Sequence, residues 1–414
     1  MDRADIVIVG GGLAGAAAAE AYRKAGGSGR VVLVSEETTL PIHRPPLSKG
    51  YLRGVETLDS VFVHPAGFYT DHSISMRLGA RVTRVDLFSK RVGLADGLEI
   101  GFGKLVLATG SRARRLPVQG ENLKGVYSLR SLADADALRA ELRPGRCAVI
   151  IGAGFVGMEV AASLTQAGLE CTVVEMAPRM WARIVPEVPA QAIQHAYKRR
   201  GVSFRFGAGV AALHGDQHVR SVRLDDGTTL EADLVLAGVG VHLNTEIARD
   251  AGLDVDGGVR VDDYLTTSQS DVYAVGDIAR FPDPVGGSIH LEHWDNALAQ
   301  GRVVGATLAG RPSRFEHLAY FFSDMFDLSL NMVGYPTDWD DIVVRGNPEA
   351  ESFTTLYLRN GALRAALMVN DEQNFSVWES LIESCRSLAG NTATLANPEL
   401  DPGALAPVEL PSPA

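Results

Sequence analysis

The sequence predicts an α/β protein with two similar parallel-sheet lobes, followed by a smaller C-terminal α+β domain. Two segments, residues 4–35 and 146–175, share one plan of strand, glycine turn, helix and strand. Their apolar runs are short and β-rich, which is typical of parallel strands buried on both faces. After about residue 318 the composition becomes aromatic and β-prone, which indicates a separate domain.

The composition limits the classes of protein to consider. A chain of 414 residues is too long for one ordinary domain, and 46% hydrophobic with 21% charged residues is typical of a globular protein. The net charge of −11 speaks against nucleic-acid binding, which depends on a basic surface. No apolar run approaches the ~18 residues of a membrane helix, and the N-terminus lacks the positive charge of a signal peptide. We therefore expect a cytoplasmic protein without membrane insertion.

The cysteines and histidines do not form a recognisable chemical site. Cys147, Cys171 and Cys385 lie far apart and form no CxxC pair. His290 and His293 are three residues apart, but no third metal ligand follows them. We expect neither a redox disulfide nor a bound metal.

The first glycine motif, Gly10-x-Gly12-x-x-Gly15, follows a strand and begins a helix. Its first glycine permits a tight turn, its second lets the backbone approach a pyrophosphate, and its third lets the helix pack on the strand. Glu36 ends the next strand, where a carboxylate can bind ribose hydroxyls. The alternative is a turn that only packs an alanine-rich helix. The pattern favours a Rossmann-like dinucleotide site, whose predicted contacts are Gly10, Gly12, Leu13, Ala14, Gly15 and Glu36.

The second motif, Gly152-x-Gly154-x-x-Gly157, repeats this arrangement, with Glu175 at the end of the next strand. A carboxylate that faces the ribose 2′-hydroxyl would repel a 2′-phosphate, so the sequence favours NADH over NADPH. Arg179 and Arg183 follow and could hold a phosphate, or be solvated charges. The predicted contacts of this site are Gly152, Gly154, Phe155, Val156, Gly157, Glu175 and Arg183.

Two fingerprints in one chain require two dinucleotides, and a later segment assigns them. TTSQSDVYAVGD, which ends at Gly276 and Asp277, resembles the flavoprotein motif whose aspartate binds a ribityl hydroxyl of FAD. Taken alone, Asp277 could merely cap a turn. Together with ATG at residues 108–110, the segment resembles the two-dinucleotide, glutathione-reductase-like flavoproteins. This resemblance implies FAD in the first lobe and NADH in the second, and adds as contacts Ala108, Thr109, Gly110, Gly276, Asp277 and, in DLVLAGVG, Gly240.

The run LPIHRPPLSK at residues 40–49 narrows the resemblance. It carries no reactive cysteine of the disulfide-reductase kind. It is similar to the RPPLSK element of oxygenase-coupled ferredoxin reductases of the putidaredoxin reductase type, and of apoptosis-inducing factor. GFVGMEVA and HLEHWDNALAQG match the same group, whereas YFFSDMFDLSL in the third domain matches more loosely.

The resemblance implies roles for particular side chains. Lys49 would sit near flavin N5, and Glu159 would approach Lys49 and the nicotinamide; these are the predicted catalytic residues. The alternatives are a surface lysine and an ordinary acid near a helix N-terminus. A paired carboxylate would limit the cost of burying the lysine charge. The implied FAD contacts are Arg44 at the pyrophosphate, Pro45 after it, Arg114 and the backbone of Val82 at the FAD head, and His293 and Trp294 at the isoalloxazine. The alternatives are a histidine with an ordinary hydrogen bond and a core tryptophan.

The predicted activity is hydride transfer from NADH to FAD, with electrons passing to a separate acceptor. The chain lacks four cysteines for a cluster of its own, so an iron–sulfur acceptor would have to be a separate protein. The resemblance implies that this partner is a [2Fe–2S] ferredoxin or Rieske-type protein of a cytochrome P450 or dioxygenase. Alternatives are a rubredoxin reductase, a reductase of quinone, monodehydroascorbate or oxygen, and a redox signalling protein like apoptosis-inducing factor. The candidate docking residues for an acidic partner are Arg302, Arg311 and Arg314, although each could be only a solvated surface arginine.

The predicted domains follow from these segments. Residues 1–115 and 241–318 form a discontinuous FAD-binding domain, residues 116–240 an NAD-binding domain, and residues 319–395 the α+β domain. Residues 396–414, rich in proline and acids, are expected to form a flexible tail. The sequence leaves open whether the protein is a monomer or a homodimer.

Overall fold

A computed structural model describes residues 2–336 and 338–405. The chain forms two compact units. The first contains the residues up to Pro46 together with Glu56–Arg112 and Val241–His317, and the second contains Leu47–Val55, Ala113–Gly240 and the chain from Leu318 onward. The second unit therefore combines the predicted NAD-binding and C-terminal domains with a short segment that carries Lys49.

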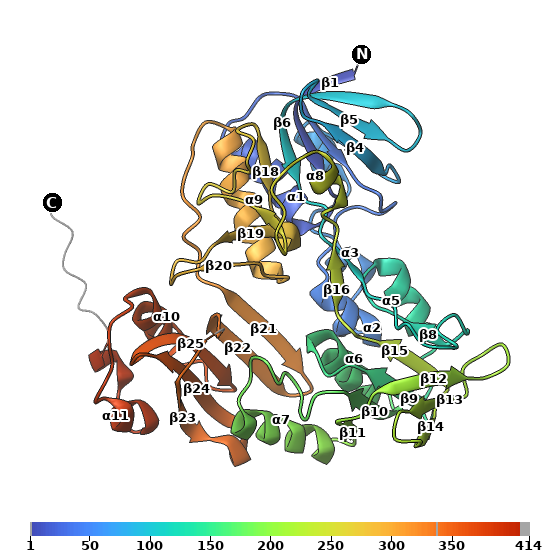
Figure 1. Ribbon diagram of the computed structural model, residues 1–414, viewed down its shortest axis with the longest axis vertical. Coiled ribbons are helices and arrows are strands. Elements are labelled where there is room, and N and C mark those ends of the chain that lie inside the picture. Colours follow the sequence, from blue (N-terminus) through green and yellow to red (C-terminus); the bar gives the residue numbers. More distant parts are fainter. Residues whose placement is uncertain (1, 337, 406–414) are drawn as a thin grey trace. The chain divides into compact units, whose positions relative to one another are not determined.

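The first unit is built on a mixed sheet in the order β3-β2-β1-β6-β5-β4, with β18 also paired to β6 (Figure 1). The strands β1, β2, β3, β6 and β18 run parallel, and every residue of β2 is buried, as expected for strands covered on both faces. The bounds are β1 (Asp2–Val9), β2 (Val31–Val34), β3 (Ile74–Arg77), β4 (Val82–Asp86), β5 (Arg91–Leu94), β6 (Glu99–Leu107) and β18 (Val272–Ala274).

Two helices of this unit, α1 (Leu13–Lys24) and α9 (Trp294–Leu308), pack closely side by side (Figure 1). A Cβ atom at Gly301 would lie 2.4 Å from the main-chain oxygen of Ala14, and one at Gly305 would lie 2.4 Å from that of Ala18. The alanines of α1 and the glycines of α9 therefore let the two backbones approach. This contact brings the start of α9 to the same end of the unit as the first glycine loop.

The second unit contains a five-stranded parallel sheet in the order β11-β10-β9-β15-β8. Its strands are β8 (Val126–Tyr127), β9 (Cys147–Ile151), β10 (Glu170–Glu175), β11 (Ser203–Phe206) and β15 (Leu234–Ala237). The helices of this lobe are α5 (Leu132–Arg139), α6 (Phe155–Gln166) and α7 (Glu187–Arg199). A small antiparallel sheet joins β12 (Val210–His214), β13 (Ser221–Leu224) and β14 (Thr229–Glu231).

The C-terminal part of this unit is an antiparallel sheet in the order β21-β22-β25-β24-β23, with α10 packed on β22 and β25 and α11 on β23 (Figure 1). It shares one hydrophobic core with the NAD lobe, in which Met158 and Tyr197 join Leu330, Met332 and Leu367. The bounds are β21 (Tyr320–Met325), β22 (Leu328–Gly334), β23 (Asp341–Asn347), β24 (Ser352–Arg359), β25 (Ala362–Val369), α10 (Phe375–Glu383) and α11 (Thr392–Ala396).

Residues 396–405 of the expected tail are described, and residues 406–414 lie outside the described residues. The buried guanidinium of Arg345 donates hydrogen bonds to the carbonyl oxygens of Asn397 at 2.5 Å, Leu400 at 2.8 Å and Pro398 at 3.1 Å. These bonds fasten the chain beyond α11 to β23.

The remaining elements are short. None of the helices in residues 2–336 and 338–405 is long and apolar enough to cross a membrane. The short elements are η1 (Pro45–Ser48), α2 (Gly50–Arg53), α3 (Leu58–Val61), α4 (Gly67–Asp71), β7 (Ser111–Ala113), β16 (Val241–Leu243), α8 (Glu246–Asp250), β17 (Val259–Arg260), η2 (Gly276–Ile278), β19 (Ala279–Pro282), β20 (Ser288–Ile289), η3 (Pro348–Ala350) and η4 (Pro402–Leu405).

Candidate functional site

The first glycine loop connects β1 to α1, and two of its glycines are required by close backbone contacts. Gly10 has φ +125°, and a Cβ there would lie 1.9 Å from the carbonyl oxygen of Ala108. A Cβ at Gly15 would lie 2.2 Å from the carbonyl oxygen of Gly10. The structure therefore brings the glycine loop and the ATG segment, which are about 100 residues apart, to one edge of the sheet, as parallel strands require.

The middle glycine of each motif has a different environment. A Cβ built at Gly12 or at Gly154 would meet no atom of the protein within 4 Å. Each of these glycines is the N-cap of the following helix, and neither helix has a side-chain cap there. Each helix therefore presents uncapped N–H groups and its positive dipole end to open space that a side chain would fill. This geometry fits two pyrophosphate groups, one on each loop.

The GD motif lies at the same edge of the first unit. Asp277 follows β18 in η2, and its carboxylate accepts a hydrogen bond of 2.6 Å from the Ser111 hydroxyl. The amide of Gly276, at φ +75°, donates to the side-chain oxygen of Gln300 at 2.8 Å. The Gln300 amide in turn donates to Asn296 at 3.2 Å, and both amide side chains are buried. Sequence reasoning missed these two amides, although both lie in the quoted HLEHWDNALAQG run.

Trp294 is the first residue of α9, and its indole Nε1 donates to Nδ1 of His43 at 2.9 Å. Burial lowers the pKa of His43, which agrees with a neutral imidazole that accepts this bond. His293 is the N-cap of α9, and its ring accepts from the Asp295 amide at 3.4 Å. Sequence reasoning also missed His43, which belongs to the quoted LPIHRPPLSK run.

The other predicted FAD contacts of the first unit lie nearer the surface. Arg44, which precedes Pro45 and η1, pairs with Glu37 at 2.9 Å. Glu36 is 69% exposed at its side chain and lies 3.7 Å from Arg81. Val82 is half-buried and begins β4. These positions leave Glu36 accessible at the end of β2, where a ribose is predicted.

The second glycine loop, between β9 and α6, repeats the first. A Cβ at Gly152 would lie 2.4 Å from the carbonyl oxygen of Gly238, and one at Gly157 would lie 2.1 Å from that of Gly152. Glu175 ends β10, and its carboxylate accepts hydrogen bonds of 2.8 Å from the amides of Ala153 and Ala177. The predicted ribose acid is thus fixed directly beside the loop.

The segment after Glu175 contains both arginines and an aromatic contact that the sequence did not reveal. Arg179 donates to the carbonyl oxygens of Ala182 at 3.2 Å and Val185 at 3.4 Å, so it holds its own loop, whereas Arg183 is exposed. Trp181, at φ +46°, stacks on Phe155 of the glycine loop with ring centroids 5.2 Å apart.

Two further predicted contacts lie next to each other in the second unit. The amide of Arg114 donates to the carbonyl oxygen of Gly240 at 2.9 Å, and Gly240 has φ +92°. The sequence predicts that Arg114 contacts the FAD head and that Gly240 is a cofactor contact.

The predicted catalytic pair is formed within the second unit. Lys49, the N-cap of α2, has its Nζ atom 2.6 Å from Oε1 of Glu159 on α6. The side chains are 14% and 8% exposed, so neither residue is a solvated surface charge. The hydroxyls of Ser48 and Ser323 also donate to the Glu159 carboxylate. Both serines occur in quoted motifs, yet sequence reasoning gave them no role.

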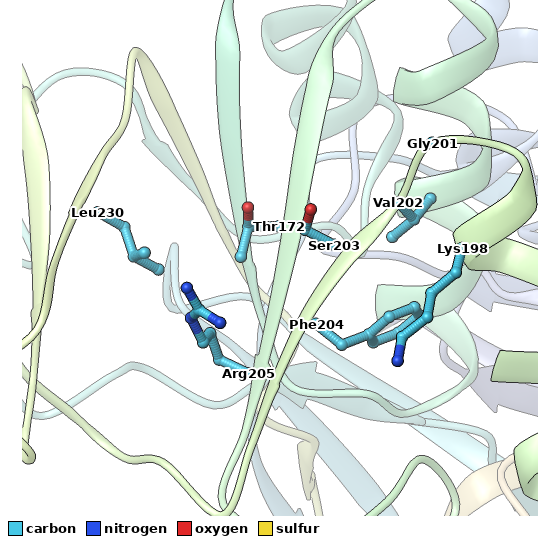
Figure 2. A pocket seen from close by; sticks show the side chains of 8 residues that line it. All are labelled: Thr172, Lys198, Gly201, Val202, Ser203, Phe204, Arg205 and Leu230. Carbon is cyan, nitrogen blue, oxygen red and sulfur yellow. The ribbon is translucent and has the colours of Figure 1, made fainter. Parts of the chain in front are cut away.

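A pocket of about 500 Å³ in the second unit is separate from the predicted contacts. Figure 2 shows its lining side chains on both sides of the edge strand β11, with Arg205 directed towards Leu230 on one side and Phe204 beside Lys198 on the other. None of its lining residues is a predicted site residue. They are Thr172, Lys198, Gly201, Val202, Ser203, Phe204, Arg205 and Leu230.

Comparisons with known proteins match almost the whole chain. Residues 4–301 match the family described as pyridine nucleotide-disulphide oxidoreductase, and residues 320–405 match the family described as reductase C-terminal. The chain is 38% identical to rhodocoxin reductase of Rhodococcus erythropolis, covering 84% of this chain and 82% of that protein. It is 37% identical to the 5,5'-dehydrodivanillate O-demethylase ferredoxin reductase subunit of Sphingobium sp., covering 92% and 94%.

A solved structure is similarly close. The reductase chain of a covalent putidaredoxin reductase–putidaredoxin complex superposes with a TM-score of 0.90 at 35% identity, covering 92% of this chain and 93% of that chain. The same fold therefore extends over both units.

Proposed function

The chain belongs to the pyridine nucleotide-disulphide oxidoreductase family, and from this premise we propose that it is an NADH-dependent reductase of a [2Fe–2S] ferredoxin. It is an FAD-dependent NAD(P)H oxidoreductase of the ferredoxin reductase group, since a reductase C-terminal domain and similar ferredoxin reductases accompany the family match. The observation that carries the proposal is the pair of glycine cradles, the loops at Gly12 and Gly154 where a Cβ would meet no protein atom within 4 Å, together with the largely buried Lys49–Glu159 pair.

The two cradles divide the cofactors between the units. The loop at Gly12, with Asp277 at the same sheet edge, would hold FAD, and the loop at Gly154, with Glu175 beside it, would hold NADH. Glu175 supports the choice of NADH because a second negative charge on the ribose would face its carboxylate. Bound FAD would supply the redox chemistry, namely acceptance of hydride from NADH and release of the electrons one at a time.

The chain's own residues supply binding and electrostatics. The helix N-termini attract the two diphosphates, and the loop glycines let the backbone approach them. Lys49 provides a positive charge that is largely shielded from water, and Glu159 keeps that charge compensated. Trp294, fixed by its bond to His43, would form an aromatic wall beside the isoalloxazine.

The proposed acceptor is a separate iron–sulfur protein. A ferredoxin reductase among the similar proteins and a reductase solved in complex with putidaredoxin both support this choice. The three cysteines of the chain are too few for a cluster of its own. The electrons would then reach a cytochrome P450 or a dioxygenase. The three cysteines form no disulfide, which supports the proposal that the protein functions in a reducing compartment, the cytoplasm.

Anaerobic stopped-flow measurements test the acceptor. We expect NADH to reduce the bound flavin rapidly and a [2Fe–2S] ferredoxin to reoxidise it faster than rubredoxin, quinone or oxygen does. Faster reoxidation by rubredoxin or by a small molecule would replace the proposed acceptor. A long-lived complex of reduced flavin and NAD⁺ that every acceptor reoxidises slowly would instead indicate a signalling protein.

The role of Lys49 can be tested separately. We expect Lys49→Ala to retain less FAD or to be reduced by NADH at least about tenfold more slowly, because a charge-assisted contact is lost. Arg53→Ala, which changes a half-buried residue of the same short helix α2 whose guanidinium bonds to Gln166, is the control. Unchanged flavin content and reduction rate in Lys49→Ala would contradict the assigned role.

A further inference from the structure

We infer that Ser48 and Ser323 are positioning residues, which hold the Glu159 carboxylate so that Lys49 can turn from it towards negative charge at the flavin. The inference rests on the proposed function, because it concerns the hydride-transfer site. It assigns to the C-terminal domain, which supplies Ser323, a direct part in the electrostatics of that site.

The Glu159 carboxylate has a hydrogen-bond donor on each oxygen in addition to the lysine. Oε1 accepts from Nζ of Lys49 and from Oγ of Ser323, both at 2.6 Å, and Oε2 accepts from Oγ of Ser48. Glu159, Ser48 and Ser323 are all buried, with Ser323 only 1% exposed. These donors therefore hold the carboxylate in one orientation with little competition from water.

The two serines are themselves fixed by separate elements. Ser48 ends η1, and its carbonyl oxygen accepts a 2.6 Å hydrogen bond from Ser163, which lies one turn after Glu159 on α6. The end of η1 is thus attached to one face of α6 through both Glu159 and Ser163. Ser323 lies in β21, where its backbone is paired with Leu330 of β22. The two hydroxyls consequently reach Glu159 from independent supports.

Tyr197 is a further titratable group near Glu159, and it adds no charge there. Tyr197 is fully buried near it, and burial raises the pKa of Tyr197 well above its usual value, so its hydroxyl stays neutral. That hydroxyl donates instead to the carbonyl oxygen of Met158 at 3.1 Å. The lysine and the two serines are therefore the donors that determine how the carboxylate is held.

This arrangement changes the cost of moving Lys49. A buried carboxylate that loses its only partner is strongly destabilised, because neither water nor a second donor replaces the lost cation. Here one hydroxyl remains on each carboxylate oxygen when Lys49 turns away. Lys49 can therefore be shared between Glu159 and a negative charge that develops nearby, whereas without the serines it would stay bound to Glu159.

The test compares Ser323→Ala and Ser48→Ala holoenzymes with the wild type. With less support on Glu159, Lys49 stays on the carboxylate, so we expect a more negative midpoint potential for the bound flavin in anaerobic spectroelectrochemistry. We also expect the limiting rate of flavin reduction at saturating NADH to fall about tenfold, with the NADH Kd changed less than about twofold. Ser323→Thr, which keeps the hydroxyl, should restore both values.

Two further variants separate positioning from general damage. Ser329→Ala removes a hydroxyl from the neighbouring strand β22 that donates to the exposed Glu372, and it should behave like the wild type. In a Glu159→Gln background, Ser323→Ala should cause no additional change in potential, because its partner charge is absent.

Three results would overturn the inference. They are wild-type potential and reduction rate in both alanine variants, a failure of Ser323→Thr to restore them, or a full additional effect of Ser323→Ala in Glu159→Gln. If Ser323→Ala does not fold, the potential and reduction rate of Ser48→Ala decide the question, because Ser48 lies on a different element. A wild-type protein that NADH does not reduce would refute the proposed function itself, independently of all the serine variants.

Discussion

At the scale of single residues, the predicted chemistry depends on where carboxylates and rings are held. Glu175 is fixed by two backbone amides at the second glycine loop, and His43 accepts the indole N–H of Trp294. In both cases a polar side chain is oriented by the protein before a dinucleotide binds. Each contact gives a prediction that one substitution can check.

We expect Glu175→Ala to narrow the preference for NADH over NADPH. The substitution removes the negative charge that would face the 2′-phosphate of NADPH, and Arg183 nearby is exposed and available to that phosphate. The measurement is kcat/KM for both nucleotides. The ratio of the NADH value to the NADPH value should fall by about tenfold. Arg183→Ala in the same background should partly reverse the gain for NADPH. Equal constants for wild type and Glu175→Ala would show that the acid does not discriminate.

Acid should weaken the His43–Trp294 contact. Burial holds the pKa of His43 below its usual 6.5, so the unfolded chain takes up a proton that the folded state resists. The stabilisation from neutral His43 is therefore complete above pH 6.5 and is lost as the pH falls towards the folded-state pKa. We expect the unfolding free energy of His43→Gln to fall less than that of the wild type between pH 7.5 and pH 5.5. Parallel pH curves for the two proteins would rule this out.

At the scale of elements, the glycines of each strand–loop–helix motif have two different roles. Some are required by the fold, and the middle one is required by the ligand. Gly10 and Gly152 approach backbone carbonyls, whereas Gly12 and Gly154 face open space in an extended conformation that any residue can adopt. The middle glycines can therefore be changed without disturbing the fold.

We expect Gly12→Ala to fold normally but to lose FAD, because the new methyl group occupies the predicted pyrophosphate position. Gly154→Ala should keep FAD and raise the Kd for NADH by about tenfold or more. Each variant is the control for the other, measured by flavin content, NADH titration and the unfolding free energy of the apoprotein. Loss of both ligands in either variant would mean that the cradles are not separate.

The sequence was sufficient to predict these units because their signals are local. The glycine spacing, the apolar runs and the acids after each second strand all lie within about 30 residues. The supports of the site are not local in this sense. Ser323 is 164 positions from Glu159, and His43 is 251 positions from Trp294, whose indole it binds. A serine or histidine has no pattern that reveals such a partner before the chain is folded.

At the scale of the whole molecule, two domains that the sequence predicts as separate belong to one compact unit of the structure. The predicted NAD-binding and C-terminal domains differ clearly in composition, yet they share one hydrophobic core within the second unit. Side-chain contacts between distant segments create this core, and no local pattern announces them. The end of the chain is similar, since its proline-rich composition did not reveal the carbonyl oxygens that Arg345 binds.

We expect Arg345→Met to release the segment after α11. The guanidinium is buried and its hydrogen bonds go to carbonyl oxygens, so their loss leaves those oxygens without donors and costs about 1–3 kcal/mol of unfolding free energy. Hydrogen exchange should rise in residues 392–405 and stay unchanged in β9 and β10. Arg359→Met, which removes an exposed ion pair with Asp338, is the control. Wild-type exchange in residues 392–405 of Arg345→Met would show that other contacts hold the segment.

The shared core also decides how the protein can be re-engineered. One design for changing the electron acceptor of a reductase is to replace its C-terminal domain with that of a relative. Here such a graft would replace Leu330, Met332 and Leu367 while leaving Met158 and Tyr197 behind, so the halves of one core would come from different parents. A working chimera has to carry α6 and α7 along with the domain it transplants. The part of this protein that can be exchanged as a whole is therefore the second unit, not the C-terminal domain alone.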